Sequence, residues 1–318
     1  MKKVSLIIPV FNTVNLLRRC LESAVNQSYP EMEIICVDDG STDGSEIILD
    51  EYAKRDSRLI VIHQKNKGES AARNAGLKIA SGNYIGFMDC DDWIELSMYE
   101  RMVYEMQSRN VDLAACGYFI STDFKSVPVK NKKIVSENVF DRTSLYQYVY
   151  ERDAYKGFTS WIWCKLFKRE LLEQNGELLL FDETFRMGAD ILFFHKAASR
   201  VNTAYYIPDP YYHYYQRPTS TSHSSDLEIV VDMINVYQRM IDFMETEGIE
   251  QESAIWLKRF KVYWATILGE RAYDQGNKFH LQLAQNTMKQ YRQEYINTNK
   301  QYPDRLKRYD EILAYRLV

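Results

Sequence analysis

Short apolar runs alternate with amphipathic segments over the first third of the chain, and this alternation constrains the fold more than any other feature. The apolar runs have the length of buried strands and lie at residues 4–10, 33–37, 59–62 and 84–88. The segments between them carry apolar side chains at helical spacing, as at residues 15–27 and 70–80. Such alternation predicts an α/β fold, with a mostly parallel sheet covered by helices on both faces.

The rest of the chain is less regular until about residue 227, where the pattern becomes purely helical. A strand begins at residue 112, and a polar, lysine-containing stretch at 122–138 predicts a loop or hairpin. A strand is then expected at 204–207, and helices at 96–108, 140–150, 188–198, 227–246, 252–274, 280–297 and 304–317, with a short element plus a helix at 161–175. We expect three parts, at residues 1–120, 121–225 and 226–318.

Composition excludes several classes of protein. The net charge is −4, so a mainly electrostatic nucleic-acid binder is not indicated. The five cysteines are odd in number and form no CxxC pair, which indicates neither a disulfide framework nor a zinc site. No apolar run approaches the roughly 20 residues of a membrane span, and the first residues do not resemble a signal peptide. A cytoplasmic protein is expected.

Three carboxylates follow the run at 84–88, in the sequence Asp89-Cys90-Asp91-Asp92. In an extended segment Asp89 and Asp91 point the same way, and two carboxylates on one face suit Mn²⁺ or Mg²⁺. The alternative is a loop in which Asp91 or Asp92 caps the next helix. On these residues alone the two interpretations are equally good.

Two other strand ends carry polar residues. Asp38 ends the run at 33–37, where a carboxylate can accept the N–H of a nucleobase or the hydroxyls of a ribose. The alternative is a tight turn in which Ser41, Thr42 or Asp43 caps the next helix. After the third run, Gly68 opens a helix whose N-terminus favours an anion, with Lys67 and Arg73 beside it. An exposed helix start with solvated charges would look the same.

Other nucleotide-handling classes lack their motifs. No GxGxxG follows the first strand, and no GxxxxGK[ST] occurs, which excludes a dinucleotide-binding site and a P-loop. A phosphatase that forms an aspartyl-phosphate would carry its paired aspartates after the first strand, not the fourth.

Four segments together, in order and spacing over roughly the first 120 residues, resemble family 2 glycosyltransferases of the GT-A fold, in particular bacterial enzymes that build cell-envelope polysaccharides. They are 4–12 (VSLIIPVFN), 37–43 (VDDGSTD), 66–74 (NKGESAARN) and 87–92 (FMDCDD). The resemblance implies a Rossmann-like sheet plus a C-terminal helical region. It also implies that Asp91 is the chief ligand of Mn²⁺ or Mg²⁺ and that Asp89 contacts ribose or metal. The remaining nucleotide-binding residues it implies are Pro9, Phe11, Asn12, Asp38, Lys67, Arg73 and Cys90.

The second half resembles the family more loosely. Residues 181–193 resemble the segment with the catalytic base, here Asp190, although Ala189 replaces the usual glutamate. Asp182 and Glu183 are the fallback candidates, and a helix N-terminal carboxylate is the structural alternative for Asp190.

Three further residues are candidates for diphosphate or acceptor binding. Lys165 lies in a Trp-x-Lys-Leu-aromatic segment, and His213 and Arg217 lie in an aromatic segment that ends in a Ser-rich loop. For His213, a packed or surface histidine is the alternative.

The resemblance implies an inverting hexosyl- or N-acetylhexosaminyltransferase. Its donor is a nucleotide-sugar, with UDP-sugars as first choice, and its acceptor is a hydroxyl of a glycan or lipid-linked saccharide. A non-catalytic, glycosyltransferase-like scaffold subunit is the alternative. Residues 256–264 mix aromatic and basic side chains. They predict either a peripheral contact with the inner face of the membrane, or a packed helix or homo-oligomer interface.

Overall fold

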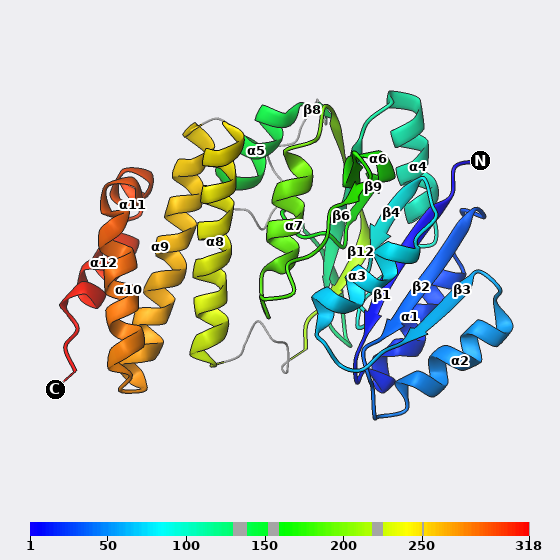
Figure 1. Cartoon of the computed structure of the whole chain (residues 1–318), viewed down its shortest axis with the longest axis horizontal. Helices are drawn as coiled ribbons and strands as arrows, with labels where there is room; N and C mark the ends of the chain where they lie inside the picture. The colour runs from blue at the N-terminus through cyan, green and yellow to red at the C-terminus, as the bar shows by residue number, and fades with distance from the viewer. Residues whose placement is uncertain (130–138, 152–158, 218–224, 250, 318) are drawn as a thin grey trace. The chain divides into compact units, whose positions relative to one another are not determined.

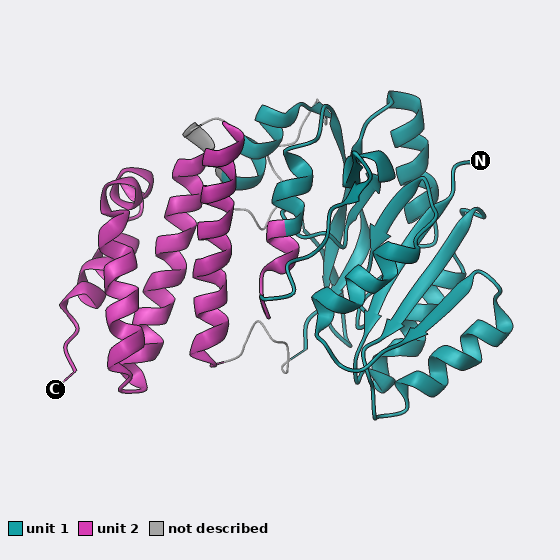
Figure 2. Ribbon diagram, viewed as in Figure 1, with its two compact units in different colours: residues 1–184, 193–217 teal, residues 185–192, 218–318 magenta. Residues whose placement is uncertain are grey.

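The computed structural model describes residues 1–318 except 130–138, 152–158, 218–224, 250 and 318. The described chain forms two compact units (Figure 2). Unit 1 comprises residues 1–184 and 193–217, and unit 2 comprises residues 185–192 and 218–318. The predicted excursion at 122–138 includes a short strand, β7 (Ser126–Pro128). Its residues 130–138 lie outside the described part.

Within the described residues, unit 1 is built on a ten-stranded sheet in which β1 (Val4–Val10) lies between β2 (Met32–Asp38) and β4 (Tyr84–Phe87) (Figure 1). The order is β3-β2-β1-β4-β9-β6-β12-β5, and β3, β2, β1 and β4 pair in parallel. The other strands are β3 (Leu59–His63), β5 (Trp93–Ile94), β6 (Leu113–Ser121), β8 (Val139–Phe140), β9 (Lys165–Lys168) and β12 (Ala204–Tyr215). The mostly parallel sheet confirms the predicted α/β fold.

Helices cover both faces of this sheet. Leu6, Ile8 and Val10 of β1 share a core with the buried sides of α1 (Val14–Val25), α2 (Ser45–Arg55) and α4 (Met98–Arg109). The intervening residue Ile7 faces α3 (Glu69–Ile79), in which Gly76 allows close approach, since a Cβ there would lie 2.6 Å from Ile7 Cγ2. Unit 1 also contains α5 (Arg142–Glu151), α6 (Arg169–Leu172) and a hairpin of β10 (Glu173–Gln174) with β11 (Glu177–Leu178).

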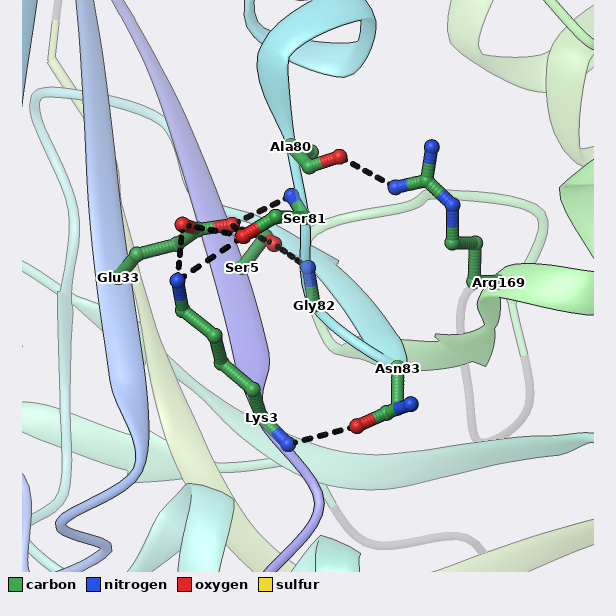
Figure 3. Close-up of polar contacts among 8 residues, drawn as sticks. All are labelled: Lys3, Ser5, Glu33, Ala80, Ser81, Gly82, Asn83 and Arg169. Carbon is green, nitrogen blue, oxygen red and sulfur yellow. Dashed lines mark hydrogen bonds and ion pairs between the residues drawn. The ribbon is translucent and has the colours of Figure 1, made fainter.

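An ionic cluster around the buried Glu33 joins the amino ends of β1 and β2 to the turn before β4 (Figure 3). Glu33, which is 5% exposed, accepts hydrogen bonds from Lys3 Nζ (2.5 Å), Ser5 Oγ (2.5 Å) and Ser81 N (2.6 Å). Gly82 N donates to Ser5 Oγ at 2.8 Å. Burial alone would raise the pKa of Glu33, but these hydrogen bonds outweigh it and lower the pKa to about 2.

Unit 2 is helical, as the sequence predicts, although one predicted helix is divided. It contains α8 (Leu227–Glu247), α9 (Gln251–Asp274), α10 (Lys278–Gln290), α11 (Arg292–Asn299) and α12 (Pro303–Ala314). The division falls at Tyr291, which leaves helical geometry (φ −118°) and buries its ring in the core of the unit. Helix α7 (Ala189–Ala198) begins in unit 2 and ends in unit 1.

The aromatic and basic run at 256–264 lies on α9, which packs against α8, α10, α11 and α12. Arg259 and Lys261 are buried, and Lys261 lies 4.9 Å from the centre of the Tyr291 ring and donates to Gln238. These contacts favour a packed helix over a membrane surface. Within the described residues, no helix is both long and apolar enough to cross a membrane.

Candidate active site

The predicted nucleotide and metal residues of unit 1 meet at the carboxyl edge of the sheet. In register, Val10 of β1 pairs with Asp38 of β2, which pairs with His63 of β3. On the other side of β1, Ile7 pairs with Phe87 of β4, so the Asp89–Asp92 turn emerges at the same edge. The chain runs from β1 outward to β3 and then returns to the opposite side of β1 at β4. Such a reversal is where open α/β sheets bind ligands.

Asp38 is buried at this edge and is held from two directions. Its Oδ1 accepts from Ser41 N at 2.9 Å, and its Oδ2 lies 2.9 Å from His63 Nδ1. His63 Nε2 lies 3.3 Å from Asp50 Oδ1. The hydrogen bond to Asp38 raises the pKa of His63, because the imidazolium can donate to both carboxylates. Sequence reasoning missed His63, although it ends the third apolar run as Asp38 ends the second.

Phe11 lies on the loop that follows β1 and has an exposed ring, with 48% of its surface accessible. The loop is fixed by Asn12, whose N–H donates to Ser41 Oγ at 3.1 Å and whose Oδ1 accepts from Thr42 N at 2.9 Å. Asn12 adopts a left-handed conformation (φ 47°), which asparagine tolerates better than most residues. Pro9 is buried within β1. An aromatic face therefore stands on the loop next to the Asp38 turn, as a base pocket requires.

Asp39 and Asp43 organise the loops of this edge. Asp39 is buried and accepts from Lys67 N at 2.9 Å and Gly68 N at 2.8 Å, which anchors the start of α3. The Lys67 side chain itself is exposed. Asp43 accepts from Ser45 N at 3.0 Å and from Val14 N at 2.9 Å, so it binds the first N–H groups of α2 and α1. The N-cap residue of α2 is Gly44, so the predicted cap by Ser41, Thr42 or Asp43 was wrong.

Asp89 and Asp91 are each faced by an arginine. Arg73 Nη2 lies 2.8 Å from Asp89 Oδ1, and Arg217 Nε lies 3.1 Å from Asp91 Oδ2. Burial, reinforced by the Asp89 carboxylate, raises the pKa of Asp91, so this position favours additional positive charge. The Cys90 thiol between them contacts Thr13 Oγ1 at 3.1 Å, and burial raises its pKa to about 12.

The donor set fits a metal ion that is shared with a ligand. Among the described residues, no group of three His, Cys, Asp or Glu side chains is placed to enclose an ion. Asp89 and Asp91 remain 25% and 17% exposed. Mg²⁺ and similar ions are commonly held by one or two carboxylates, with water and phosphate oxygens completing the shell. Asp89 and Asp91 are suited to that mode of binding.

Asp92 is not a helix cap, so that alternative was wrong for this residue. Helix α4 begins after Ser97, and Asp92, at 1% exposure, instead accepts from Tyr212 Oη at 2.6 Å and Tyr215 N at 2.7 Å. Tyr212 Oη also accepts from Asp89 N at 3.1 Å. The turn that carries the paired carboxylates is therefore attached to the end of β12.

Asn74 is a second residue whose role the sequence did not indicate. Its side chain, at 1% exposure, accepts from Phe181 N at 2.8 Å and donates to Phe181 O at 3.0 Å and Glu183 Oε1 at 2.8 Å. The neighbouring Arg73 lies over the Phe181 ring at 5.5 Å. Helix α3 therefore connects the Asp89 turn to the segment that holds the fallback base candidates Asp182 and Glu183.

The structure places Lys165 and His213 in packed surroundings. Lys165 is fully buried, and its ammonium group donates to Trp161 O. The His213 ring is stacked between Trp93 and Phe119, and its Nε2 lies 2.8 Å from Glu95 Oε1. For His213, the sequence left open the alternative of a packed histidine, and the structure shows that packing. In these positions both side chains support the fold around the site.

Asp190 lies in the part of α7 that belongs to unit 2. It is half-buried in the first helical turn, where a carboxylate is favoured by the helix dipole. The turn before it is tightly packed, since a Cβ on Gly188 (φ 83°) would lie 2.7 Å from Met233 Sδ. Ala189 is 5% exposed, so a glutamate in its place would enter a buried position.

Comparison with known proteins identifies the family. Residues 5–176, more than half of the chain, match the family described as Glycosyl transferase family 2, and the chain belongs to it. The uncharacterized glycosyltransferase EpsJ of Bacillus subtilis is 33% identical over 217 residues, which are 68% of this chain and 62% of EpsJ.

Solved structures extend the likeness to the fold. S. aureus TarS 1–349, in complex with UDP-GlcNAc, is 20% identical with a TM-score of 0.63 over 95% of this chain and 92% of that chain. A mannosyltransferase from Pyrobaculum calidifontis, in complex with GDP-Man and Mn²⁺, is 19% identical with a TM-score of 0.53 over 93% and 85%. The predicted GT-A fold with a C-terminal helical region is thereby confirmed.

Proposed function

We propose that this chain is an inverting glycosyltransferase. It moves a hexosyl or N-acetylhexosaminyl group from a nucleotide-sugar, with UDP-sugars as first candidates, to a hydroxyl of a glycan or lipid-linked acceptor. One observation carries the proposal. Asp38, supported by His63, and the pair Asp89 and Asp91 emerge at one carboxyl edge, where the strand order reverses around β1. This arrangement supplies both a base-binding end and a diphosphate-binding end for one nucleotide.

The roles follow from the chemistry of each position. Phe11 offers a ring on which a nucleobase can stack, and Asp38 offers a carboxylate that accepts its N–H. Asp89 and Asp91 would hold Mn²⁺ or Mg²⁺, which, when bound, supplies Lewis-acid stabilisation of the leaving diphosphate. Arg73 is placed to fix the Asp89 carboxylate in position. These residues bind and orient the donor.

The acceptor hydroxyl must lose its proton as it attacks the anomeric carbon. We assign the proton to the Asp190 carboxylate, which belongs to the α7 turn in unit 2. General-base catalysis of this kind contributes about 10²–10⁴-fold. A single displacement inverts the anomeric centre.

A donor screen tests the proposal. Native chain with Mn²⁺ is incubated with UDP-, GDP- and dTDP-sugars, and release of the nucleoside diphosphate is measured. We expect one nucleotide class to be hydrolysed in a metal-dependent way. Asp190→Asn should then abolish transfer and leave nucleotide binding intact, whereas Asp182→Asn should retain transfer.

The same screen can contradict the proposal. Transfer that survives in Asp190→Asn but is lost in Asp182→Asn would move the base to Asp182. Binding without turnover of any donor would favour the alternative, a scaffold subunit, for which the buried Ala189 in place of the usual glutamate is the supporting feature.

A further inference from the structure

The two arginines that face the paired carboxylates are held in very different ways. Arg73 is 6% exposed at its side chain, and its Nη2 lies 2.8 Å from Asp89 Oδ1 and 2.7 Å from Glu69 Oε1. Both contacts have hydrogen-bond geometry, and the guanidinium lies 5.5 Å from the centre of the Phe181 ring. Arg73 is therefore a fixed counter-ion of Asp89.

Arg217 is held much more loosely. Its side chain is 36% exposed, and its Nε lies 3.1 Å from Asp91 Oδ2. Among the described residues, that Nε has no hydrogen-bond partner with the required geometry, whereas Arg73 makes two hydrogen bonds through its Nη2. A guanidinium that is committed to a carboxylate makes short, aligned bonds, often two in parallel. The contact between Arg217 and Asp91 therefore neutralises charge without a directional bond.

From this contrast we infer that Arg217 is an exchangeable counter-ion, which neutralises Asp91 in the free protein and gives way to the divalent ion when the donor binds. The inference rests on the proposed function. A metal ion on Asp91 and a guanidinium 3.1 Å from the same carboxylate carry like charges, so they compete for it. Once released, the Arg217 charge is available to the diphosphate of the donor.

The exchange predicts coupling between metal and nucleotide. A metal ion that binds without nucleotide has to displace Arg217, and the displaced guanidinium finds no new anion. The affinity for the metal alone is therefore weakened. A diphosphate provides an anion both for the metal and for the released Arg217, so metal and nucleotide strengthen each other's binding. Thermodynamic linkage makes this effect equal in both directions. Removal of the Arg217 charge should therefore strengthen metal binding alone and weaken nucleotide binding with metal.

The test is a Mn²⁺ titration followed by the electron paramagnetic resonance signal of free Mn²⁺, with and without UDP. The chains are the native protein, the neutral variants Arg217→Gln and Arg217→Met, and the charge-preserving Arg217→Lys. Arg18→Gln serves as a matched control, because Arg18 pairs with Glu51 at 2.8 Å on the surface of the same unit. A thermal unfolding curve confirms that each variant is folded.

We expect both neutral variants to bind Mn²⁺ alone on the order of fivefold more tightly, since a partly exposed ion pair is removed. With saturating Mn²⁺ they should bind UDP on the order of tenfold more weakly, because a charge-assisted contact is lost. Arg217→Lys and Arg18→Gln should stay close to the native chain in both measurements.

Unchanged or weaker Mn²⁺ binding in both neutral variants would overturn the exchange. The proposed function would survive that result, provided that the native chain still binds UDP with Mn²⁺. A native chain that bound neither Mn²⁺ nor UDP would overturn the exchange and the proposed function together.

Discussion

Replacement of Glu33 by glutamine should destabilise unit 1 and leave the candidate active site intact. Glu33 is an anion surrounded by the donors of Lys3, Ser5 and Ser81 at the amino ends of the strands. In the native chain both carboxylate oxygens of Glu33 accept hydrogen bonds. Glutamine keeps one of these oxygens and puts an NH₂ group in place of the other, where it faces N–H or O–H donors. The predicted nucleotide and metal residues lie at the opposite, carboxyl ends of the same strands.

The pKa of Glu33 gives the magnitude. It is lowered from 4.5 to about 2. At about 1.4 kcal/mol for each unit, the anion contributes on the order of 3 kcal/mol to the free energy of unfolding at pH 7. Because the folded-state pKa is the lower one, this contribution is complete above the unfolded value of 4.5 and is lost as the pH falls through about 2. Less than half of it should remain at about pH 3.

Urea unfolding measures the loss of unfolding free energy in Glu33→Gln, and hydrogen exchange of the Ser81 and Gly82 amides reports the local loss of stability. Glu33→Gln should lower the midpoint strongly at pH 7 and by much less at pH 3, with unchanged UDP binding. Glu51→Gln, which removes an exposed ion pair with Arg18, is the matched control and should leave the midpoint unchanged. Equal midpoints for Glu33→Gln and the native chain at pH 7, or a difference in midpoint that does not narrow at pH 3, would show that the Glu33 anion does not stabilise unit 1.

Three other substitutions give separable results. The contact between His63 and Asp38 raises the pKa of His63, so it stabilises the folded chain below the usual histidine pKa. This stabilisation is lost as the pH rises through the raised pKa. The difference in melting temperature between the native chain and His63→Ala should therefore narrow from pH 6 to pH 9. Asn74→Ala should cost on the order of 2 kcal/mol in urea unfolding, because the backbone groups of Phe181 lose their buried partner. Phe11→Ala should weaken UDP binding and leave the melting temperature unchanged, since the ring is exposed. A melting-temperature difference for His63→Ala that stays constant with pH would contradict the ion pair with Asp38. An unchanged free energy of unfolding in Asn74→Ala would contradict its structural role, and native UDP affinity in Phe11→Ala would contradict base stacking on that ring.

Local pattern was sufficient to predict the parallel part of the sheet and the loops at its carboxyl edge. The strand that ends at Asp38 and the strand before Asp89 are short apolar runs, and their burial follows from that composition. Turn chemistry correctly indicated a turn after Asp38, although Gly44 and not Asp43 is the N-cap residue of α2. Whether Asp38 and Asp91 bind a nucleotide and a metal, and whether Asp190 is the base, stay predictions.

Long-range contacts account for what the sequence did not predict. Asn74 and Phe181 are 107 residues apart, and Tyr212 and Asp92 are 120 residues apart, so no local pattern joins them. The predicted strand at 204–207 continues to Tyr215 because β12 passes its prolines in irregular pairing with β6, with register shifts on both sides of Pro210. Gly117 permits this irregularity, since a Cβ there would lie 2.6 Å from Pro208 O.

Metal-assisted nucleotide binding at Asp91 is tested by calorimetric titration of UDP into the native chain and into Asp91→Asn, each with and without Mn²⁺. We expect UDP binding to the native chain to depend on Mn²⁺, and Mn²⁺ to add little to UDP binding in Asp91→Asn. Glu51→Gln, which removes an exposed ion pair with Arg18, should behave as the native chain does. UDP binding that does not change with Mn²⁺ in the native chain, or that Mn²⁺ strengthens equally in Asp91→Asn, would contradict the assignment of Asp91 as a metal ligand.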